Sequence, residues 1–302
     1  MAKIAYVGVG AMGQALIQRL LAAGHAVTAY NRSVEKTRRV QQAGAAIAPT
    51  PRLAAQGADA VFCSVTDDEA SRAVWAGPDG VLSAELRPST FMIECSTLSH
   101  DWVLELAALV TRRGFRYIDC PVSGRPDAAE AGDLRLFLGA SPADLAEIRP
   151  LLESLGTKIQ FFHFGPVGAG TAFKLIHNLN GAIQVAAIAE AMAQAEAAGI
   201  DLHVAAQGFA AGYGGSRHVR QHSAVMAEGK KGQEVAFSGR GRLKDALYGM
   251  RLAEKLGRQA LVGKAAADVW GQMVNSGMGN ANDSELIDVL RAAADAGKIR
   301  SR

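Results

Sequence analysis

Hydrophobic residues in the first half of the chain occur as short runs that alternate with amphipathic stretches. Lys3–Val9 is such a run, and a helical pattern follows it over Met12–Ala23. The predicted strands are Lys3–Val9, His25–Tyr30, Ala58–Ser64, Thr90–Glu94, Phe115–Asp119, Leu134–Leu138 and Lys158–Phe162. Helical stretches such as Trp102–Arg113 lie between them. Strands that alternate with helices are typical of an α/β fold with a mostly parallel, doubly wound sheet.

The second half of the chain shows helical patterns and no strand pattern. Its longest stretch runs from Gly165 to about Gly199 and is mostly apolar on all sides, which predicts a long helix buried among other helices. Further helices are predicted at Asp201–Phe209, Leu243–Leu256, Leu261–Ser276 and Ser284–Ala296. We therefore predict two domains, residues 1–164 with the sheet and residues 165–302 with helices alone, joined by the long helix.

A glycine motif joins the first predicted strand to the helix that follows it. Residues 8–13 read GVGAMG, a GxGxxG pattern between strand and helix. In such a turn the first glycine allows the tight bend, the second lets the backbone approach a pyrophosphate, and the third lets helix and strand pack closely. This setting predicts a Rossmann domain that binds a dinucleotide. The residues expected at the cofactor are Gly8, Gly10, Ala11, Met12 and Gly13.

The end of the second predicted strand favours one form of the cofactor. NAD-binding domains usually carry a carboxylate there, which bonds the ribose 2′-hydroxyl group. This chain has Asn31, Arg32 and Ser33, with Lys36 a helical turn further on. A cation beside hydroxyl and amide donors suits a 2′-phosphate, so we expect NADP(H), with NAD(H) as the alternative. If Arg32 only stacks on the adenine, the choice of cofactor stays open.

Polar residues follow three other predicted strands at their carboxyl ends, where doubly wound sheets bind their ligands. They lie in segments 64–66, 95–97 and 120–124, which read SVT, CST and CPVSG. Cys63, Cys95 and Cys120 lie at or near these ends, and their spacing is not that of metal ligands. We interpret the cysteines as small core residues and expect no metal site.

Lys174 is the most unusual residue of the long predicted helix. Asn178 lies four residues later, so the two side chains share one helix face. Burial of a lysine is costly unless its ammonium group is paired or used. From this stretch alone, the favoured interpretation is a lysine that reaches the surface from the end of the helix.

Composition excludes several classes of protein. The net charge of +3 is small for 302 residues and the basic residues are scattered, which indicates neither nucleic acid nor an anionic membrane as partner. No apolar run resembles a membrane span. The first predicted strand begins at Lys3, so we expect no signal or transit peptide and a cytoplasmic protein.

Four segments, in order along the chain, resemble the motifs of the β-hydroxyacid dehydrogenase family, whose type member is 3-hydroxyisobutyrate dehydrogenase. They are GVGAMGQALIQRLLAAGHAVTAYNRS at 8–33, IDCPVSG at 118–124 with GDL at 132–134, the stretch from GAG at 168–170 to Lys174 and Asn178, and Phe237 with Lys244, Asp245 and GMGNANDSELIDVL. The resemblance implies hydride transfer between NADP(H) and a small β-hydroxy acid or the corresponding semialdehyde or oxo acid. It also implies a Rossmann domain and a 6-phosphogluconate dehydrogenase C-terminal-like helical domain for substrate binding and assembly into a homodimer or homotetramer.

The resemblance assigns roles to the matching positions. The implied catalytic residues are Lys174, Asn178 and Ser123, with the lysine as acid and base. The implied substrate-binding residues are Ser123, Gly124, Arg125, Lys174, Asn178, Phe237 and Asp245. Further cofactor-binding positions are Ser64, Val65, Thr97 and Lys244.

Three departures from the family pattern bear on the substrate. Arg125 stands where a second glycine is common, and it either contacts an anionic substrate or points to solvent. His177 replaces the first of two asparagines, and we expect it to pack or bond locally, with a second polar group at the site as the alternative. Residues 238–242, SGRGR, are more basic and glycine-rich than the family's apolar run. We interpret them as a solvated loop, with recognition of a more anionic substrate as the alternative.

Two other functions remain as alternatives. An imine reductase shares the architecture and the Asn-Arg segment, but such enzymes generally carry Asp, Tyr or another residue at the position of Lys174. A catalytically inactive protein would bind NADPH without turnover. The paired Lys174 and Asn178 argue against this last interpretation.

Overall fold

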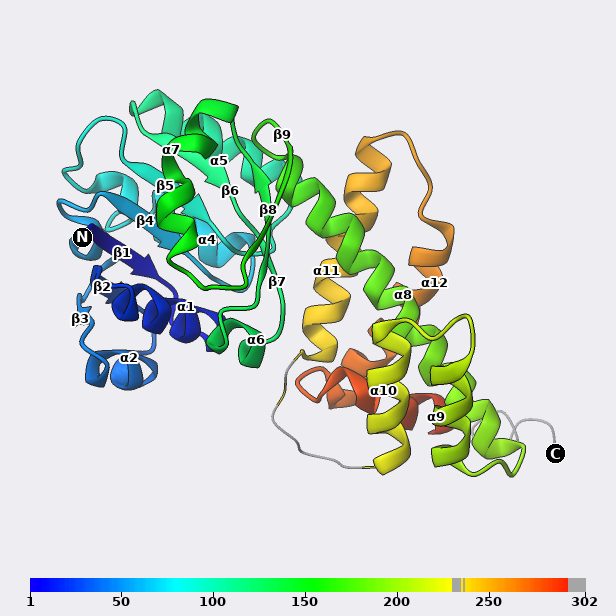
Figure 1. Ribbon diagram of the computed structural model, residues 1–302. Helices are drawn as coiled ribbons and strands as arrows, with labels where there is room; N and C mark the ends of the chain where they lie inside the picture. Colours follow the sequence, from blue (N-terminus) through cyan, green and yellow to red (C-terminus); the bar gives the residue numbers. More distant parts are fainter. Residues whose placement is uncertain (230–234, 236, 293–302) are drawn as a thin grey trace. The chain divides into compact units, whose positions relative to one another are not determined.

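The computed structural model describes residues 1–229, 235 and 237–292, and the chain divides into two compact units (Figure 1). The first unit spans Met1–Lys174 and the second Leu175–Arg302, so the division falls inside the long helix α8, Ala169–Ala197. The predicted division after residue 164 lies at the end of strand β9, Gln160–Gly165. Each unit has a hydrophobic core of its own.

Nine strands of the described chain form one sheet in the first unit (Figure 1). They are β1 Lys3–Val7, β2 Ala26–Tyr30, β3 Ala46–Ile47, β4 Ala60–Cys63, β5 Phe91–Glu94, β6 Arg116–Asp119, β7 Val122–Ser123, β8 Arg135–Gly139 and β9 Gln160–Gly165. Their order across the sheet is β3-β2-β1-β4-β5-β6-β8-β7, and β9 also pairs with β8. Pairing is parallel from β3 across to β6, antiparallel from β8 to β6 and β7, and parallel between β8 and β9. The predicted doubly wound, mostly parallel sheet is confirmed.

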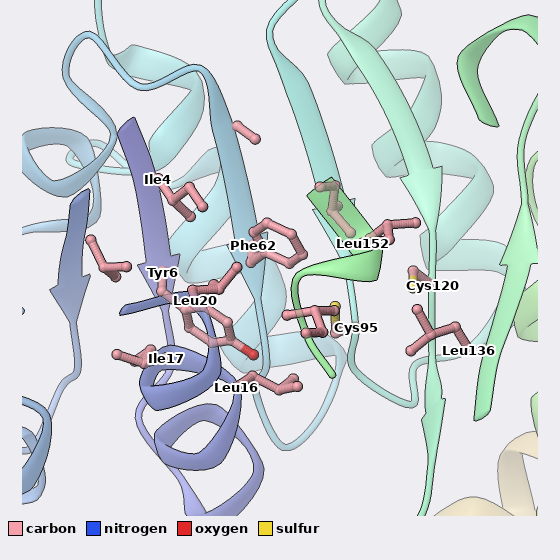
Figure 2. Packing of buried hydrophobic residues seen from close by; sticks show 14 of the residues in the cluster. Ile4, Tyr6, Leu16, Ile17, Leu20, Phe62, Cys95, Cys120, Leu136 and Leu152 are labelled. Carbon is pink, nitrogen blue, oxygen red and sulfur yellow. The ribbon is translucent and has the colours of Figure 1, made fainter. Parts of the chain in front are cut away.

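Helices cover both faces of this sheet. They are α1 Ala11–Ala22, α2 Arg38–Gln42, α3 Pro51–Ala55, α4 Asp68–Ala76, α5 His100–Arg112, α6 Pro126–Glu130 and α7 Pro142–Glu153, with 3-10 turns at Val34–Thr37 and Val81–Ser83. Ile4 and Tyr6 of β1 belong to the apolar cluster under α1 and α7, which Figure 2 shows. Ala5 and Val7 belong to the opposite cluster with Trp75 of α4. Both faces are therefore buried, which explains why the strands read as continuous hydrophobic runs.

The second unit is built from helices around α8. The others are α9 Leu202–Ala211, α10 Arg217–Glu228, α11 Gly239–Lys255 and α12 Leu261–Met273; a π turn at Val274–Met278 and a 3-10 turn at Asp283–Glu285 precede residues 286–292, which are helical. Trp270 is fully buried, and its indole N–H donates to the Ala182 carbonyl of α8 at 3.1 Å. A Cβ on Gly249 would lie 3.0 Å from the Leu175 carbonyl oxygen, so this glycine lets α11 pack closely against α8.

Part of the second unit differs from the sequence prediction. Helix α10 is missing from the predicted set, because its sequence RHVRQHSAVMAE has few apolar positions. The solvated loop predicted for residues 238–242 is wrong. Ser238 caps α11 by accepting a hydrogen bond from the Gly241 N–H group, and Arg242 in the first turn is buried.

The start of the last predicted helix is confirmed. Asn282 and Glu285 form a reciprocal capping box at this point. Residues 293–296 of that predicted helix lie outside the described residues. None of the helices described here has the length and apolar character needed to cross a membrane.

Candidate active site

The glycine turn after β1 has the geometry that a bound pyrophosphate requires. Gly8 has a φ angle of +96°, and a Cβ there would lie 2.0 Å from the Ser64 carbonyl oxygen. A Cβ on Gly13 would lie 2.1 Å from the Gly8 carbonyl oxygen, whereas one on Gly10 would meet no atom within 4 Å. Helix α1 begins at Ala11 without a side-chain cap, so its first N–H groups are suited to a phosphate.

The segment after β2 is tied to this turn by a side-chain amide. The Asn31 Oδ1 atom accepts a hydrogen bond from the Val9 N–H group at 2.9 Å, and its Nδ2 atom donates to the Ser33 carbonyl oxygen at 2.8 Å. Arg32 and Lys36 are exposed on either side of Ser33. Asn31 therefore shapes the loop, while the exposed cation of Arg32 is the group suited to a 2′-phosphate.

The predicted residues at the ends of β4 and β5 form a bonded layer beside the glycine turn. The Ser64 hydroxyl group bonds the Tyr6 hydroxyl group at 2.7 Å, and the Val65 N–H group donates to Ser96 Oγ at 2.8 Å. Thr97 follows as a half-buried residue. Ser64, Val65 and Thr97 thus lie just beyond the carboxyl ends of two neighbouring parallel strands, where doubly wound sheets bind their ligands.

A buried carboxylate beneath this layer was not among the predicted residues. Glu94, the last residue of β5, is fully buried and accepts hydrogen bonds from the Trp75 indole, the Ser71 hydroxyl group and the Ser96 N–H group. Burial raises the pKa of the Glu94 carboxyl group, against the effect of these donors. The network orients Ser96, which in turn holds Val65. The sequence signal for this buried carboxylate is an acidic residue at the end of an otherwise apolar strand, as in FMIE of β5.

Asp119 at the end of β6 anchors the start of α8. Its two carboxylate oxygens accept hydrogen bonds from the Gly168 and Thr171 N–H groups, each at 2.7 Å. Burial raises the pKa of Asp119 to about 6, and the hydrogen bonds to Gly168 and Thr171 only partly oppose this rise. Thr171 lies three residues before Lys174 on the same helix. Asp119 therefore determines where α8 places that lysine.

Lys174 is buried and its amine lies at the predicted substrate segment. Only 8% of the residue is exposed, so the surface-lysine interpretation is wrong. Its Nζ atom donates a hydrogen bond to the Val122 carbonyl oxygen on β7 at 2.8 Å. Ser123, the next residue of that strand, is half-buried, and Gly124 beyond it has a φ angle of +151°. The first unit therefore brings together the lysine and the segment that the resemblance assigned to the substrate.

Arg125, the next residue of this segment, is exposed and makes a long ion pair. Its side chain is 53% exposed, and its Nε atom lies 3.9 Å from the nearest carboxylate oxygen of Asp127. At this exposure an ion pair of such length contributes little to stability.

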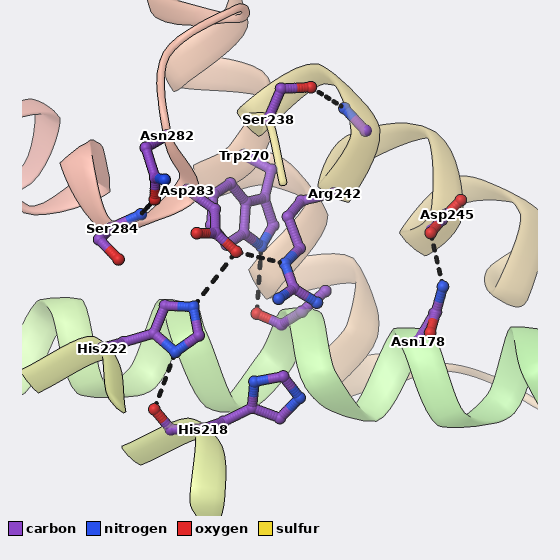
Figure 3. A network of polar contacts seen from close by, with 12 residues as sticks. Asn178, His218, His222, Ser238, Arg242, Asp245, Trp270, Asn282, Asp283 and Ser284 are labelled. Atoms are coloured by element: carbon purple, nitrogen blue, oxygen red, sulfur yellow. Dashed lines mark hydrogen bonds and ion pairs between the residues drawn. The ribbon is translucent and has the colours of Figure 1, made fainter. Parts of the chain in front are cut away.

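The second unit contains the other predicted polar residues. Asn178 lies on α8 one helical turn after Lys174, and both are buried. Its Nδ2 atom donates to Asp245 Oδ2 on α11 at 2.6 Å, as Figure 3 shows. The Lys244 ammonium group lies 3.1 Å from the other oxygen of Asp245. The α11 carboxylate thus fixes the amide of Asn178 and leaves its carbonyl oxygen for another partner.

A buried polar cluster beside Asn178 was not predicted (Figure 3). Asp283 Oδ2 accepts hydrogen bonds from Arg242 Nε at 2.9 Å and contacts His222 Nε2 at 3.2 Å. The Arg242 guanidinium group also lies over the ring of Phe237, with its carbon atom 4.5 Å from the ring centre. Because Phe237 is a predicted substrate-binding residue, the cluster adjoins that part of the candidate site.

The described residues offer no evident place for a metal ion. They contain no group of three or more His, Cys, Asp or Glu side chains arranged to hold one. Cys63, Cys95 and Cys120 are free and buried, as predicted for core residues.

Comparison with known proteins agrees with this arrangement. Residues 3–165 match the family described as the NAD binding domain of 6-phosphogluconate dehydrogenase, and residues 168–290 match that described as NAD-binding of NADP-dependent 3-hydroxyisobutyrate dehydrogenase. The NAD-dependent L-serine dehydrogenase of Pseudomonas aeruginosa is 34% identical over 207 residues, 68% of this chain and 68% of that protein. The 2-(hydroxymethyl)glutarate dehydrogenase of Eubacterium barkeri is 35% identical over 190 residues, 63% of this chain and 62% of that protein.

A solved structure extends the match to nearly the whole chain. The 3-hydroxyisobutyrate dehydrogenase of Mycobacterium tuberculosis with L-serine is 29% identical, with a TM-score of 0.84 over 96% of this chain and 99% of that one. The two matched families meet near the start of α8, beside the anchored helix turn that precedes Lys174. With its glycine turn, its doubly wound sheet and its helical second unit, this chain belongs to the β-hydroxyacid dehydrogenase family and is an NAD(P)-dependent oxidoreductase that acts on CH–OH groups.

Proposed function

We propose that the protein transfers hydride between NADP(H) and a small β-hydroxy acid or its semialdehyde, with Lys174 as the acid and base. The observation that carries this proposal is the 2.8 Å hydrogen bond from Lys174 Nζ to the Val122 carbonyl oxygen. This hydrogen bond holds the amine of a buried lysine next to Ser123. Both lie near the edge of the sheet at which doubly wound folds bind their ligands.

The residues around the glycine turn fit a nicotinamide dinucleotide. Gly8 and Gly10 would let the backbone approach the pyrophosphate, and the first N–H groups of α1 would bond it. Arg32 would pair with a 2′-phosphate, which is why we propose NADP(H) rather than NAD(H). When bound, the cofactor supplies the hydride acceptor or donor.

The proton chemistry falls to side chains of this protein. In oxidation, the neutral amine of Lys174 would accept the proton of the substrate hydroxyl group. In reduction, its ammonium group would stabilise the developing alkoxide and return a proton. Ser123 Oγ would bond the substrate carboxylate, and Asn178, one turn along α8, would orient the same molecule. The Val122 carbonyl oxygen keeps Nζ in place during this cycle.

The chemistry of the relatives' substrates supports the proposed class. By their names, two relatives act on L-serine and on 2-(hydroxymethyl)glutarate. Both compounds, like 3-hydroxyisobutyrate, carry a hydroxymethyl group on the carbon next to a carboxylate. They differ in the third substituent on that carbon, so we propose that this substituent is what the enzyme selects.

Assembly into a homodimer or homotetramer is part of the proposal. Ile200, Val204, Leu261 and Val262 of the second unit are large apolar residues that are half or more exposed. Exposed apolar groups of this kind suit a contact with another copy of the chain. Sedimentation velocity at several protein concentrations tests this part of the proposal. A protein that stays monomeric at all of them would contradict it.

A substrate panel with both cofactors tests the function. We expect NADPH consumption with an aldehyde acid such as succinic semialdehyde or glyoxylate, and none with cyclic imines. Lys174→Arg keeps the positive charge but cannot release a proton, so kcat should fall by about 100- to 10,000-fold. Lys158→Arg, at an exposed lysine, is the matched control. Near-normal turnover of Lys174→Arg, with NADPH binding intact, would refute the mechanism.

A further inference from the structure

Glu94 is a fully buried residue of the first unit that takes no part in the proposed proton chemistry. Its Oε2 atom accepts hydrogen bonds from the Trp75 indole N–H group at 2.7 Å and from the Ser71 hydroxyl group at 3.1 Å. Its Oε1 atom accepts one from the Ser96 N–H group at 2.9 Å. The two oxygens therefore bond different parts of the unit: Oε2 bonds helix α4, and Oε1 bonds the segment that follows β5.

Stability alone does not account for a carboxyl group in this place. Burial raises the pKa of Glu94, although hydrogen bonds from Ser96, Trp75 and Ser71 oppose the rise. Its charged form is therefore less favourable here than in water. Replacement of such a group and its partners by apolar groups of the same shape can be nearly neutral for stability. Buried polar groups can instead be retained because they fix one arrangement of their neighbours.

Ser96 connects this carboxylate to the glycine turn. Its Oγ atom accepts a hydrogen bond from the Val65 N–H group at 2.8 Å. The Val65 Cγ1 atom lies 3.2 Å from the position that a Cβ on Gly8 would take, and the Ser64 carbonyl oxygen lies 2.0 Å from it. Gly8 is the first glycine of the turn that would hold the pyrophosphate. Contacts therefore run without a gap from the carboxylate to the backbone of the turn.

The third glycine of the turn is supported from the same segment. Tyr6, which Figure 2 labels, is fully buried, and its hydroxyl group bonds the Ser64 hydroxyl group at 2.7 Å. The Cε1 atom of its ring lies 3.3 Å from the position that a Cβ on Gly13 would take. Residues 64 and 65 therefore support the turn at both ends, and Ser96 holds the second of them.

We propose that Glu94 is a positioning residue for the cofactor. Through Ser96 it fixes Val65 against the glycine turn, and it thereby sets the affinity for the pyrophosphate group of NADP(H) or NAD(H). Backbone N–H groups bond a phosphate well only when they are held in fixed positions, and a displaced Val65 would press on the turn or leave it without support. The inference goes beyond the proposed function, because it holds for either form of the cofactor and depends neither on Lys174 nor on the substrate.

Two serines of the network provide a matched test. Ser96→Ala removes the acceptor of the Val65 N–H group, on the side of the glycine turn. Ser71→Ala removes a hydroxyl group on the side of α4, which donates to Glu94 and accepts from the Trp102 indole. We expect Ser96→Ala to raise the Kd for NADP⁺ in calorimetric titration by about 3- to 10-fold, the size of one hydrogen bond. Ser71→Ala should leave that Kd within about twofold, although it should lower the urea midpoint of unfolding at least as far.

A fragment of the cofactor shows which part of the dinucleotide is affected. Adenosine 2′-monophosphate has no pyrophosphate group, so its Kd should be the same for the wild type and for Ser96→Ala. In turnover, the KM for NADPH should rise while kcat and the KM for the second substrate stay within about twofold. An equal loss of affinity for the fragment and the whole cofactor would overturn the inference. If the protein binds NAD⁺ more tightly than NADP⁺, NAD⁺ and adenosine are the corresponding probes.

Glu94→Gln tests the carboxylate itself. The amide oxygen can accept at one end of the side chain only, and the two donors at the Oε2 end favour that orientation. The amide NH₂ group then faces the Ser96 N–H group, so the Kd for NADP⁺ should rise about as far as in Ser96→Ala. The double variant should bind NADP⁺ no more weakly than the weaker single variant, because both changes act through Val65. Additive losses, or wild-type affinity in Glu94→Gln, would show that Glu94 does not act through Ser96.

These measurements separate the inference from the proposed function. If the Kd values follow this pattern but no hydroxy acid is turned over, the proposed function fails and the role of Glu94 stands. If hydroxy acids are turned over and Ser96→Ala and Ser71→Ala have equal Kd values for the cofactor, the inference alone is wrong. The network would then support the fold in general and not the glycine turn in particular.

Discussion

Two buried aspartates, one in each compact unit, are held in opposite ways. Asp119 in the first unit is held by the Gly168 and Thr171 N–H groups, which are neutral donors. Asp283 in the second unit is held by the Arg242 guanidinium group and by His222. Each aspartate fixes part of the candidate site: Asp119 the start of α8 before Lys174, and Asp283 the position of Arg242.

The two carboxyl groups have opposite pKa shifts for this reason. Burial raises the pKa of Asp119 to about 6, because two neutral donors compensate only part of the lost hydration. Burial acts on Asp283 in the same direction, but the His222 hydrogen bond and the Arg242 charge outweigh it and lower the pKa. A cation therefore lowers the pKa of a buried carboxyl group below its ordinary value, whereas two backbone N–H donors leave it raised. Protonation of Asp119 therefore needs little free energy. Removal of Arg242 alone would leave the charge of Asp283 buried and uncompensated, which strongly destabilises a folded protein.

Removal of Arg242 alone should have the largest effect on stability. Arg242→Met leaves the buried Asp283 with His222 as its remaining partner, and an uncompensated buried charge costs about 3–5 kcal/mol. Urea unfolding at pH 7 measures the change, with Arg240→Met at an exposed position as the control. Addition of Asp283→Asn to Arg242→Met should recover part of the loss. A loss below about 1 kcal/mol, typical of a surface change, would mean that the pair is not ionised.

Asp119→Asn should give the next largest effect, which depends on pH. The folded-state pKa of about 6 exceeds the ordinary value of 3.8, so the folded protein holds a proton there that the unfolded chain releases. Wild-type stability should therefore fall by up to about 3 kcal/mol as the pH rises through this window. The amide of the variant does not titrate, so its stability relative to the wild type should improve from pH 4 to pH 7. Paired urea titrations at pH 4.5 and 7.5 measure this difference, and a constant difference would contradict the raised pKa.

The sequence predicted those parts of the site whose geometry is local. The GVGAMG turn needs glycine at Gly8 and Gly13 because of contacts within a few residues or with the adjacent strand, and the motif records this requirement. Lys174 and Asn178 share a face because four residues make one helical turn. Strand ends could also be predicted, since apolar runs stop where the polar ligand-binding edge begins.

The polar anchors could not be predicted, because their partners are distant in sequence. Asp119 bonds residues 49 and 52 positions away, and Asp283 bonds Arg242 across 41 positions. Residues 238–242 were misinterpreted for a related reason. Glycine costs a helix about 1 kcal/mol per residue, so SGRGR favours a loop on propensity alone. The Ser238 cap and the tertiary ion pair of Arg242 outweigh that local preference.

Asp119→Ala tests whether the hydrogen bonds between Asp119 and the start of α8 position Lys174, the proposed acid and base. The Gly168 and Thr171 N–H groups lose their acceptor, and the first turn of α8 can then shift. A displacement of about 1 Å can lower a rate by up to about 100-fold, so we expect kcat to fall by about 10- to 100-fold with little change in the KM for NADPH. Asp119→Asn, which keeps one acceptor, should recover part of kcat. An unchanged kcat, or equal losses in the two variants, would mean that Asp119 does not position Lys174.

The smallest effect, and the sharpest contrast with Asp119, is expected for Asp283→Asn under acidic conditions. Because the folded-state pKa of Asp283 lies below 3.8, its charge stabilises the folded protein above that pH, and this contribution is lost as the pH falls through the folded-state pKa. The stability difference between wild type and Asp283→Asn should therefore be constant from pH 5 to pH 7 and shrink only below about pH 4. The difference for Asp119→Asn should change between pH 4 and pH 6 instead. If the stability differences of both variants changed over the same pH range, the pKa values of Asp119 and Asp283 would not be shifted in opposite directions. Neutral and cationic partners would then affect the two carboxyl groups alike.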